Sequence, residues 1–71
     1  MHRIRVSSTN VASIGYEAET ETLEVEFVNG SIYQYSEVPQ HRWDGLLNAS
    51  SKGTYLNNHI RKGPYACRRI R

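Results

Sequence analysis

The sequence predicts an α+β domain, a small antiparallel meander of about four strands followed by two helices packed on one face. In the first half of the chain, apolar and polar residues alternate over short runs, as in strands that are buried on one side. In the second half, apolar residues recur three and four positions apart, as in amphipathic helices. A block of strands before a block of helices favours an antiparallel sheet covered on one side.

Four runs are expected to form strands, separated by polar turn sequences. They are residues 3–7, 11–17, 23–27 and 31–36. Leu23, Val25 and Phe27 alternate with Glu24 and Glu26, so we expect the glutamates to lie on a solvated face. The last residues, 65–71, either add a short edge strand or form a loose tail.

The Asn29-Gly30 turn leaves two registers open for the hairpin that it joins. A two-residue turn pairs Tyr33 with Glu26, so that Tyr33 and Tyr35 face water. A turn with Gly30 in a bulge pairs Tyr33 with Val25, so that both tyrosines join the apolar face. A shift of one residue exchanges the two faces. We favour the bulged form, because it gathers the apolar side chains on one side.

The first helix is expected to begin at Val38-Pro39 and to end near Asn48-Ala49. Its apolar stripe consists of Trp43, Leu46 and Leu47. Gly45 weakens the helix unless close packing requires it.

The second helix is expected to be capped by Ser50 or Ser51 and to end at Gly63-Pro64. One of its faces carries Tyr55, Leu56, His59 and Ile60. Together the helices should pack on the apolar strand residues.

Charge is unevenly distributed along the chain. Residues 17–44 hold all seven acidic residues and one basic residue, a net charge of −6. Residues 45–71 hold six basic residues and no acidic one. Such a basic segment can bind phosphate groups, or it can pair with the acidic half of the same domain.

Composition argues against several classes of protein. Seventy-one residues form one domain with a thin core, which leaves little room for a catalytic cavity. Cys67 is the only cysteine, so no internal disulfide forms, and we expect its thiol to be partly buried. No secretory h-region or membrane span is visible, which favours a cytoplasmic protein. The three histidines are scattered, so no metal, other cofactor or catalysis is expected.

The chain resembles the KTSC domain family over most of its length, from about Val6 to Tyr65. The resemblance rests on an ordered set of motifs: Val25-Glu26-Phe27, Gly30, the YxY motif Tyr33-Gln34-Tyr35, Val38-Pro39, Leu46-Leu47-Asn48-Ala49, Ser51-Lys52-Gly53 and Tyr55 through Ile60-Arg61. The family is named after the C-terminus of certain lysyl-tRNA synthetases and includes small bacterial and phage proteins. Residues 66–71, a basic C-terminal tail, lie outside the resemblance. The synthetase context implies RNA binding.

The residues and the resemblance together predict a non-catalytic module that binds nucleic acid, most simply RNA. Ser51, Lys52 and Gly53 could form a phosphate seat at a helix start, while arginines and tyrosines could bind phosphates and stack on bases. The candidate residues are Lys52, Gly53, Asn57, His59, Arg61, Lys62, Tyr33, Tyr35, Tyr65, Arg68 and Arg69.

A protein-binding module is the alternative to RNA binding. The acidic strand face would dock a basic partner, or an edge strand would extend another sheet. A homodimer is one form of this alternative, and a regulatory or phage accessory role is another.

Overall fold

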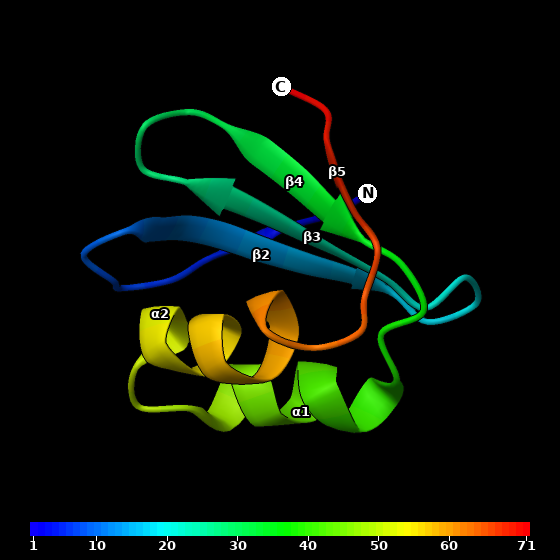
Figure 1. Cartoon of the computed structure of the whole chain (residues 1–71). Helices are drawn as coiled ribbons and strands as arrows, with labels where there is room; N and C mark the ends of the chain where they lie inside the picture. Colours follow the sequence, from blue (N-terminus) through cyan, green and yellow to red (C-terminus); the bar gives the residue numbers. More distant parts are fainter.

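The computed structural model describes all 71 residues as one sheet with helices on one side (Figure 1). The sheet is a meander of five antiparallel strands in the order β1-β2-β3-β4-β5. The strands are β1 (Ile4–Arg5), β2 (Val11–Glu17), β3 (Thr22–Phe27), β4 (Ile32–Tyr35) and β5 (Cys67–Arg69). The prediction of an antiparallel meander followed by two helices is confirmed for β1 to β4, and a fifth strand, β5, follows the helices.

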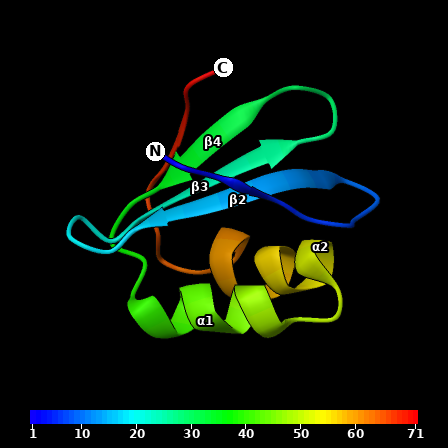
Figure 2. The same cartoon turned by 180° about the vertical axis from the view of Figure 1, so that it is seen from behind.

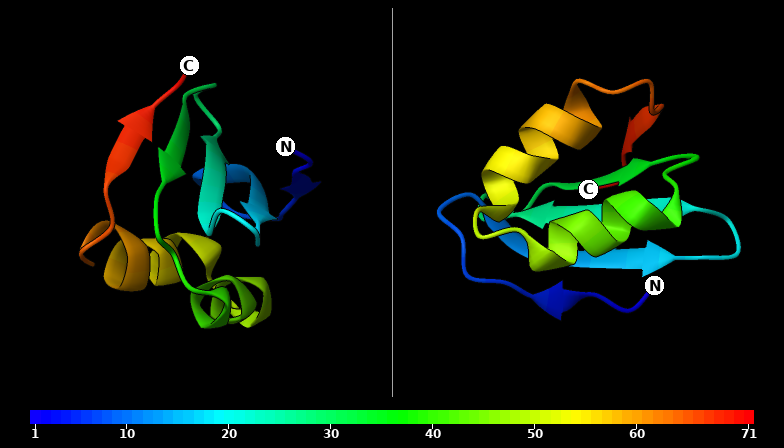
Figure 3. Two further views of the ribbon diagram at one scale, coloured as in Figure 1. Left: turned by 90° about the vertical axis from the view of Figure 1, so that its right-hand side faces the viewer. Right: turned by 90° about the horizontal axis from the view of Figure 1, so that it is seen from below.

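Two helical segments cover the same face of the sheet (Figures 1 and 2). Helix α1 (Gln40–Asn48) begins directly after Pro39, as expected. The second segment consists of α2 (Lys52–Tyr55) and the π-helix η1 (Leu56–Arg61). Ser51 is its N-cap, and the Ser51 hydroxyl accepts a hydrogen bond from Thr54 N over 3.3 Å. Figure 3 shows both segments lying across the sheet, while the other face is free of helices.

The β3-β4 hairpin has the bulged register. Val25 pairs with Tyr33 and Leu23 with Tyr35, so both tyrosines lie on the helix side of the sheet. Gly30 has a φ of 92°, a conformation that suits glycine, and its N–H donates to Phe27 O. The choice of the bulged turn is therefore confirmed.

The core lies between the sheet and the helices. It consists of Val11, Ile14, Leu23, Val25, Tyr35, Val38, Leu46, Leu56 and Ile60, each at most 4% exposed. Tyr16 and Trp43 close one side of it as stacked rings, with centroids 5.6 Å apart. The expectation that Leu47 belongs to the core is wrong, because this residue is 36% exposed. Leu47 follows Leu46 by about 100° of helical rotation, which turns it to the outer side.

The C-terminal residues form an ordered edge strand. Cys67, Arg68 and Arg69 pair with Tyr35, Gln34 and Tyr33 of β4. Beyond β5, Arg71 O accepts a hydrogen bond from Ile32 N over 2.9 Å. The basic tail is thus part of the sheet, and its arginines are held at the β4 side of the domain. None of the helices is long and apolar enough to cross a membrane.

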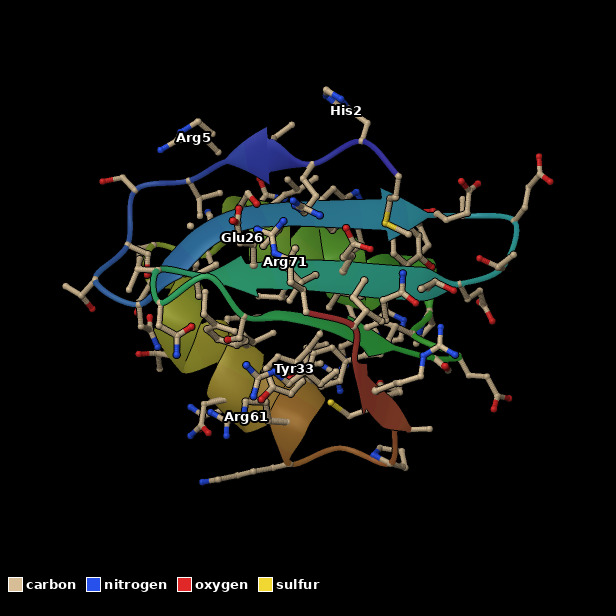
Figure 4. The ribbon with its side chains drawn as sticks, turned by 90° about the horizontal axis from the view of Figure 1, so that it is seen from above. His2, Arg5, Glu26, Tyr33, Arg61 and Arg71 are labelled. Atoms are coloured by element: carbon tan, nitrogen blue, oxygen red, sulfur yellow. The ribbon has the colours of Figure 1, made fainter.

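The helix-free face carries a network of charged groups instead of freely solvated glutamates. Glu24 is only 5% exposed, because Arg3 forms an ion pair with it and Gln34 Nε2 donates to it over 2.8 Å. Arg71 also reaches Glu26, at 3.4 Å (Figure 4). Arg3 reaches the same carboxylate at 3.9 Å. The expectation of a solvated glutamate face is therefore wrong for Glu24. Arg3 and Arg71, which lie near the two ends of the chain, therefore contact the same carboxylate.

Candidate nucleic-acid interface

A pocket of about 280 Å³ lies beside β4, on the helix side of the sheet. Strands β3 and β4, the turn between them, η1 and β5 all contribute to it. Its lining consists of Phe27, Asn29, Ser31, Tyr33, Tyr35, Arg61 and Cys67. Aromatic side chains with a few polar groups and one charged residue are the kind of lining found in small-molecule binding pockets.

Tyr33 is the aromatic centre of this pocket, and its ring is held from two sides. The Phe27 ring meets it edge to face, with centroids 5.7 Å apart and planes at 80°. The Arg69 guanidinium carbon lies 6.0 Å from the Tyr33 ring centroid. Strand β5 provides this contact, because Arg69 pairs directly with Tyr33. The bulged register and the ordered C-terminus together bring an arginine to the first tyrosine of the YxY motif.

Arg61 reaches the pocket from the last residue of η1 (Figure 4). The π-helical hydrogen bond from Lys62 N to Asn57 O spans five residues and is 3.2 Å long. In a regular α-helix, Arg61 would point about 140° away from buried Leu56, five residues earlier. Because π-helical bonding brings residues five apart closer to one face, it turns Arg61 toward the sheet. The sequence predicted a helix here and gave no sign of the π-helical turn.

Tyr35 closes the base of the pocket, where it belongs to the core. Burial, aided by the neighbouring Cys67 thiol, raises the pKa of Tyr35 to about 12, so its hydroxyl remains protonated. Cys67 itself is exposed, so the expectation of a partly buried thiol is wrong. The reason is the position of Cys67 on edge strand β5, which has no neighbour on its outer side.

A second, larger hollow of about 510 Å³ has an entirely polar lining and includes the predicted phosphate seat. It lies between the β1-β2 loop and the start of α2, and Lys52, Gly53 and Asn57 line it. The Lys52 ammonium group donates to Leu47 O and Ala49 O over 2.8 and 2.7 Å. Lys52 thus binds carbonyl groups at the end of α1, which gives it a structural role.

The remaining candidate residues lie on different surfaces. His59 is exposed, with its ring centroid 4.4 Å from that of Tyr55. Tyr65 packs beside the core, and hydrogen bonding with the Tyr55 hydroxyl and then with the Tyr65 hydroxyl raises the pKa of Arg42. Lys62 is exposed beside Arg61. Arg68 points to the helix-free face, where its Nη2 lies 3.4 Å from Gln34 Oε1.

The structure therefore brings together four of the predicted residues: Tyr33, Tyr35, Arg61 and Arg69. Asn57, Lys52 and Gly53 lie together at the other hollow. Sequence reasoning missed Phe27, Asn29 and Ser31 as pocket residues. The hairpin register was the available signal, since it places residues 31, 33 and 35 on one face.

Comparisons with known proteins identify the family of this domain. The sequence profile of the KTSC domain matches residues 7–65, so the chain belongs to the KTSC domain family. The crystal structure of a KTSC domain protein from Yersinia pestis superimposes with a TM-score of 0.89 at 38% sequence identity. The match covers 99% of this chain and 97% of that one.

The sequence is similar to two kinds of proteins, small single-domain proteins and much longer lysine–tRNA ligases. An uncharacterized protein of Stutzerimonas stutzeri is 37% identical over 70 residues, 99% of both chains. A lysine–tRNA ligase of Nostoc punctiforme is 41% identical over 51 residues, which are 72% of this chain. Those residues make up only 9% of the ligase, so this chain corresponds to a small part of that enzyme.

Proposed function

We propose that this KTSC domain is a non-catalytic module that binds single-stranded RNA at its β4-β5 side. The observation that carries the proposal is the pocket lined by Tyr33 and Arg61, with the Arg69 guanidinium carbon 6.0 Å from the Tyr33 ring centroid. An aromatic ring can stack on an unpaired base, while guanidinium groups bind phosphate oxygens by charge-assisted hydrogen bonds.

The distribution of free charge supports the same surface. The negative charges of Glu24 and Glu26 on the helix-free face are compensated by ion pairs with Arg3 and Arg71. Arg61 and Lys62, in contrast, are exposed and form no ion pair with an acidic group. A surface with uncompensated cations beside an aromatic ring suits single strands better than duplexes, whose bases are stacked.

The relatives support RNA as the nucleic acid. A lysine–tRNA ligase acts on tRNA, and the matching part of that ligase is similar to most of this chain. The proposal for this chain does not depend on Lys52, whose ammonium group already binds two carbonyl oxygens.

Binding to a protein is the second candidate, and one observation favours it. All three residues of β5 are exposed, so the sheet ends in an open edge that an extended peptide could join. Docking of a basic partner on the glutamates is less favoured, because Glu24 is buried beneath Arg3. Light scattering would reveal a homodimer formed through the open edge.

Fluorescence anisotropy with a labelled single-stranded RNA tests the proposal. We expect affinity to fall steeply between low and moderate salt, because phosphate contacts release counterions. Arg69→Gln should weaken binding and reduce the salt dependence. Glu17→Gln, a change at an exposed residue at the far end of β2, serves as the control that leaves this surface intact. An absence of binding at low salt would contradict the proposal.

A further inference from the structure

We propose that the pocket beside Tyr33 accepts the base of one unpaired nucleotide, with Arg61 binding the adjacent phosphate. This inference rests on the proposed RNA binding and adds to it a specific site and ligand. It assigns different roles to the pocket and to the surrounding charge. The pocket would select for an unstacked base, whereas the exposed arginines would respond to any polyanion.

The Tyr33 ring is fixed before any ligand arrives. Phe27 packs against it edge to face at a centroid distance of 5.7 Å, and the Arg69 guanidinium carbon lies 6.0 Å from its centroid. Strand pairing with Val25 and Arg69 on either side also fixes the backbone of Tyr33. A planar base therefore meets an aromatic wall that loses little conformational freedom on binding. Every base has a π-face, so this contact does not depend on sequence.

Arg61 is placed to bind a phosphate at the mouth of the pocket. It lines the pocket and is also exposed, so an anion can reach its guanidinium group from solvent. It also makes no hydrogen bond to an acidic side chain of the chain. The π-helical turn, an irregularity that is frequent at functional sites, directs Arg61 to this position.

The polar end of the pocket offers donors to the edge of a base. Asn29 Oδ1 accepts from Ser31 N and Ser31 Oγ, at 3.0 and 2.7 Å. These two bonds orient the Asn29 amide so that its NH₂ group points away from Ser31. Asn29 is exposed at the turn, and its free donors can reach a base oxygen or ring nitrogen.

The other features of the molecule give no comparable site. The polar hollow near Lys52 has no aromatic wall, and its one cation already binds carbonyl groups. The third hollow, of about 420 Å³, lies on the side of Arg68 and Gln34 and has no aromatic residue. Only the pocket beside Tyr33 combines an aromatic ring with an available cation.

The test compares two labelled oligomers of equal charge, a decauridine RNA and an abasic ribose-phosphate decamer. We expect the wild-type domain to bind the base-containing oligomer at least about fivefold more tightly, the weaker end of one base–aromatic stack. Tyr33→Leu should abolish this difference by weakening only the base-containing oligomer, and Tyr33→Phe should retain it. Wild-type affinity of Tyr33→Leu for the abasic oligomer would show that this variant remains folded.

A matched pair of charge variants tests the role of Arg61. Arg61→Gln and Lys62→Gln each remove one exposed positive charge from neighbouring positions, but only Arg61 lines the pocket. We expect Arg61→Gln to weaken decauridine binding severalfold more than Lys62→Gln. If both oligomers bind equally and with the same salt sensitivity, the proposal that the pocket binds a base is wrong, whereas the proposal of RNA binding is retained. Binding of neither oligomer at low salt would instead overturn the proposed function.

Discussion

The ring of Tyr55 lies against Gly45, so closely that no side chain fits at position 45. A Cβ atom on Gly45 would come within 2.9 Å of Tyr55 Cε2, and closer still to two other atoms of the Tyr55 side chain. Tyr55 belongs to α2 and Gly45 to α1, so this contact sets the distance between the two helical segments. The glycine in the middle of α1 is thus explained by packing.

Gly45→Ala is expected to destabilise the domain, although alanine is the better helix former. Alanine at an unhindered helix position would stabilise by about 1 kcal/mol relative to glycine. Here the added methyl group forces α1 and Tyr55 apart, and such overpacking costs about 1–3 kcal/mol. Urea unfolding followed by circular dichroism measures the change. If Gly45→Ala raises the midpoint, the close contact with Tyr55 is wrong.

The same substitution in a Tyr55→Ala background provides the control. With the ring removed, alanine at position 45 should stabilise relative to glycine, so the effect of the change reverses its sign. A double-mutant cycle over these variants then gives the coupling between Gly45 and Tyr55.

Leu46 and Leu47 form a matched pair for testing which side of α1 faces the sheet. Leu46 is 0% exposed and Leu47 is 36% exposed. Leu46→Ala should cost about 2–5 kcal/mol, because it leaves a cavity in the core. Leu47→Ala should change the free energy of unfolding by about 0.5 kcal/mol or less. Thermal or urea unfolding of both variants measures these changes. Similar losses of unfolding free energy in the two variants would contradict the orientation of α1.

Short-range patterns predicted the sheet because each depends on neighbouring residues alone. Alternation in residues 23–27 identified β3, and Asn29-Gly30 identified the hairpin. The bulged register could be chosen because it unites Tyr33 and Tyr35 with the apolar face. Leu47 was wrongly predicted to be buried, because Trp43, Leu46 and Leu47 all fit the i, i+3, i+4 spacing of an apolar stripe. Only contact with the sheet decides where the stripe ends.

Contacts between residues far apart in the sequence determine the features that local sequence patterns could not predict. The burial of Glu24 depends on Arg3, 21 residues away, and the order of the C-terminal strand depends on β4. The pocket combines β3, β4, η1 and β5, and the π-helical turn that orients Arg61 leaves no mark in the spacing of residues. The sequence could therefore name the tyrosines and arginines of the candidate site without showing which of them meet.

Lys52→Gln should lower stability because Lys52 binds the C-terminal carbonyl groups of α1. Its ammonium group donates to Leu47 O and Ala49 O, and a cation at a helix C-terminus also interacts favourably with the helix dipole. We expect a loss of about 1 kcal/mol in the free energy of unfolding. Lys62→Gln, at an exposed position without such contacts, should stay within about 0.5 kcal/mol of the wild type. A Lys52→Gln variant that weakens RNA binding at unchanged stability would instead support the predicted phosphate seat.

Glu24 is expected to make the domain sensitive to acid. Burial opposes ionisation of Glu24, but hydrogen bonds from Gln34 and Arg3 outweigh burial, so the pKa of Glu24 is lowered. A carboxylate whose pKa is lower in the folded state contributes stability above the unfolded pKa of about 4.3. That contribution is lost as the pH falls through the folded pKa, because protonation ends the attraction to Arg3.

Unfolding measured by urea between pH 7 and pH 2 tests the role of Glu24. Glu24→Gln should be less stable than the wild type at pH 7, and the difference should shrink as the pH falls from about 4 through the lower folded pKa of Glu24, below which both side chains are neutral. Glu19→Gln, at an exposed position in the β2-β3 turn, removes the same charge outside the Arg3 network and should keep the wild-type profile. If Glu24→Gln showed the full wild-type loss of stability in acid, another carboxylate would have to account for it. Glu26, which also contacts Arg3, is the next residue to substitute.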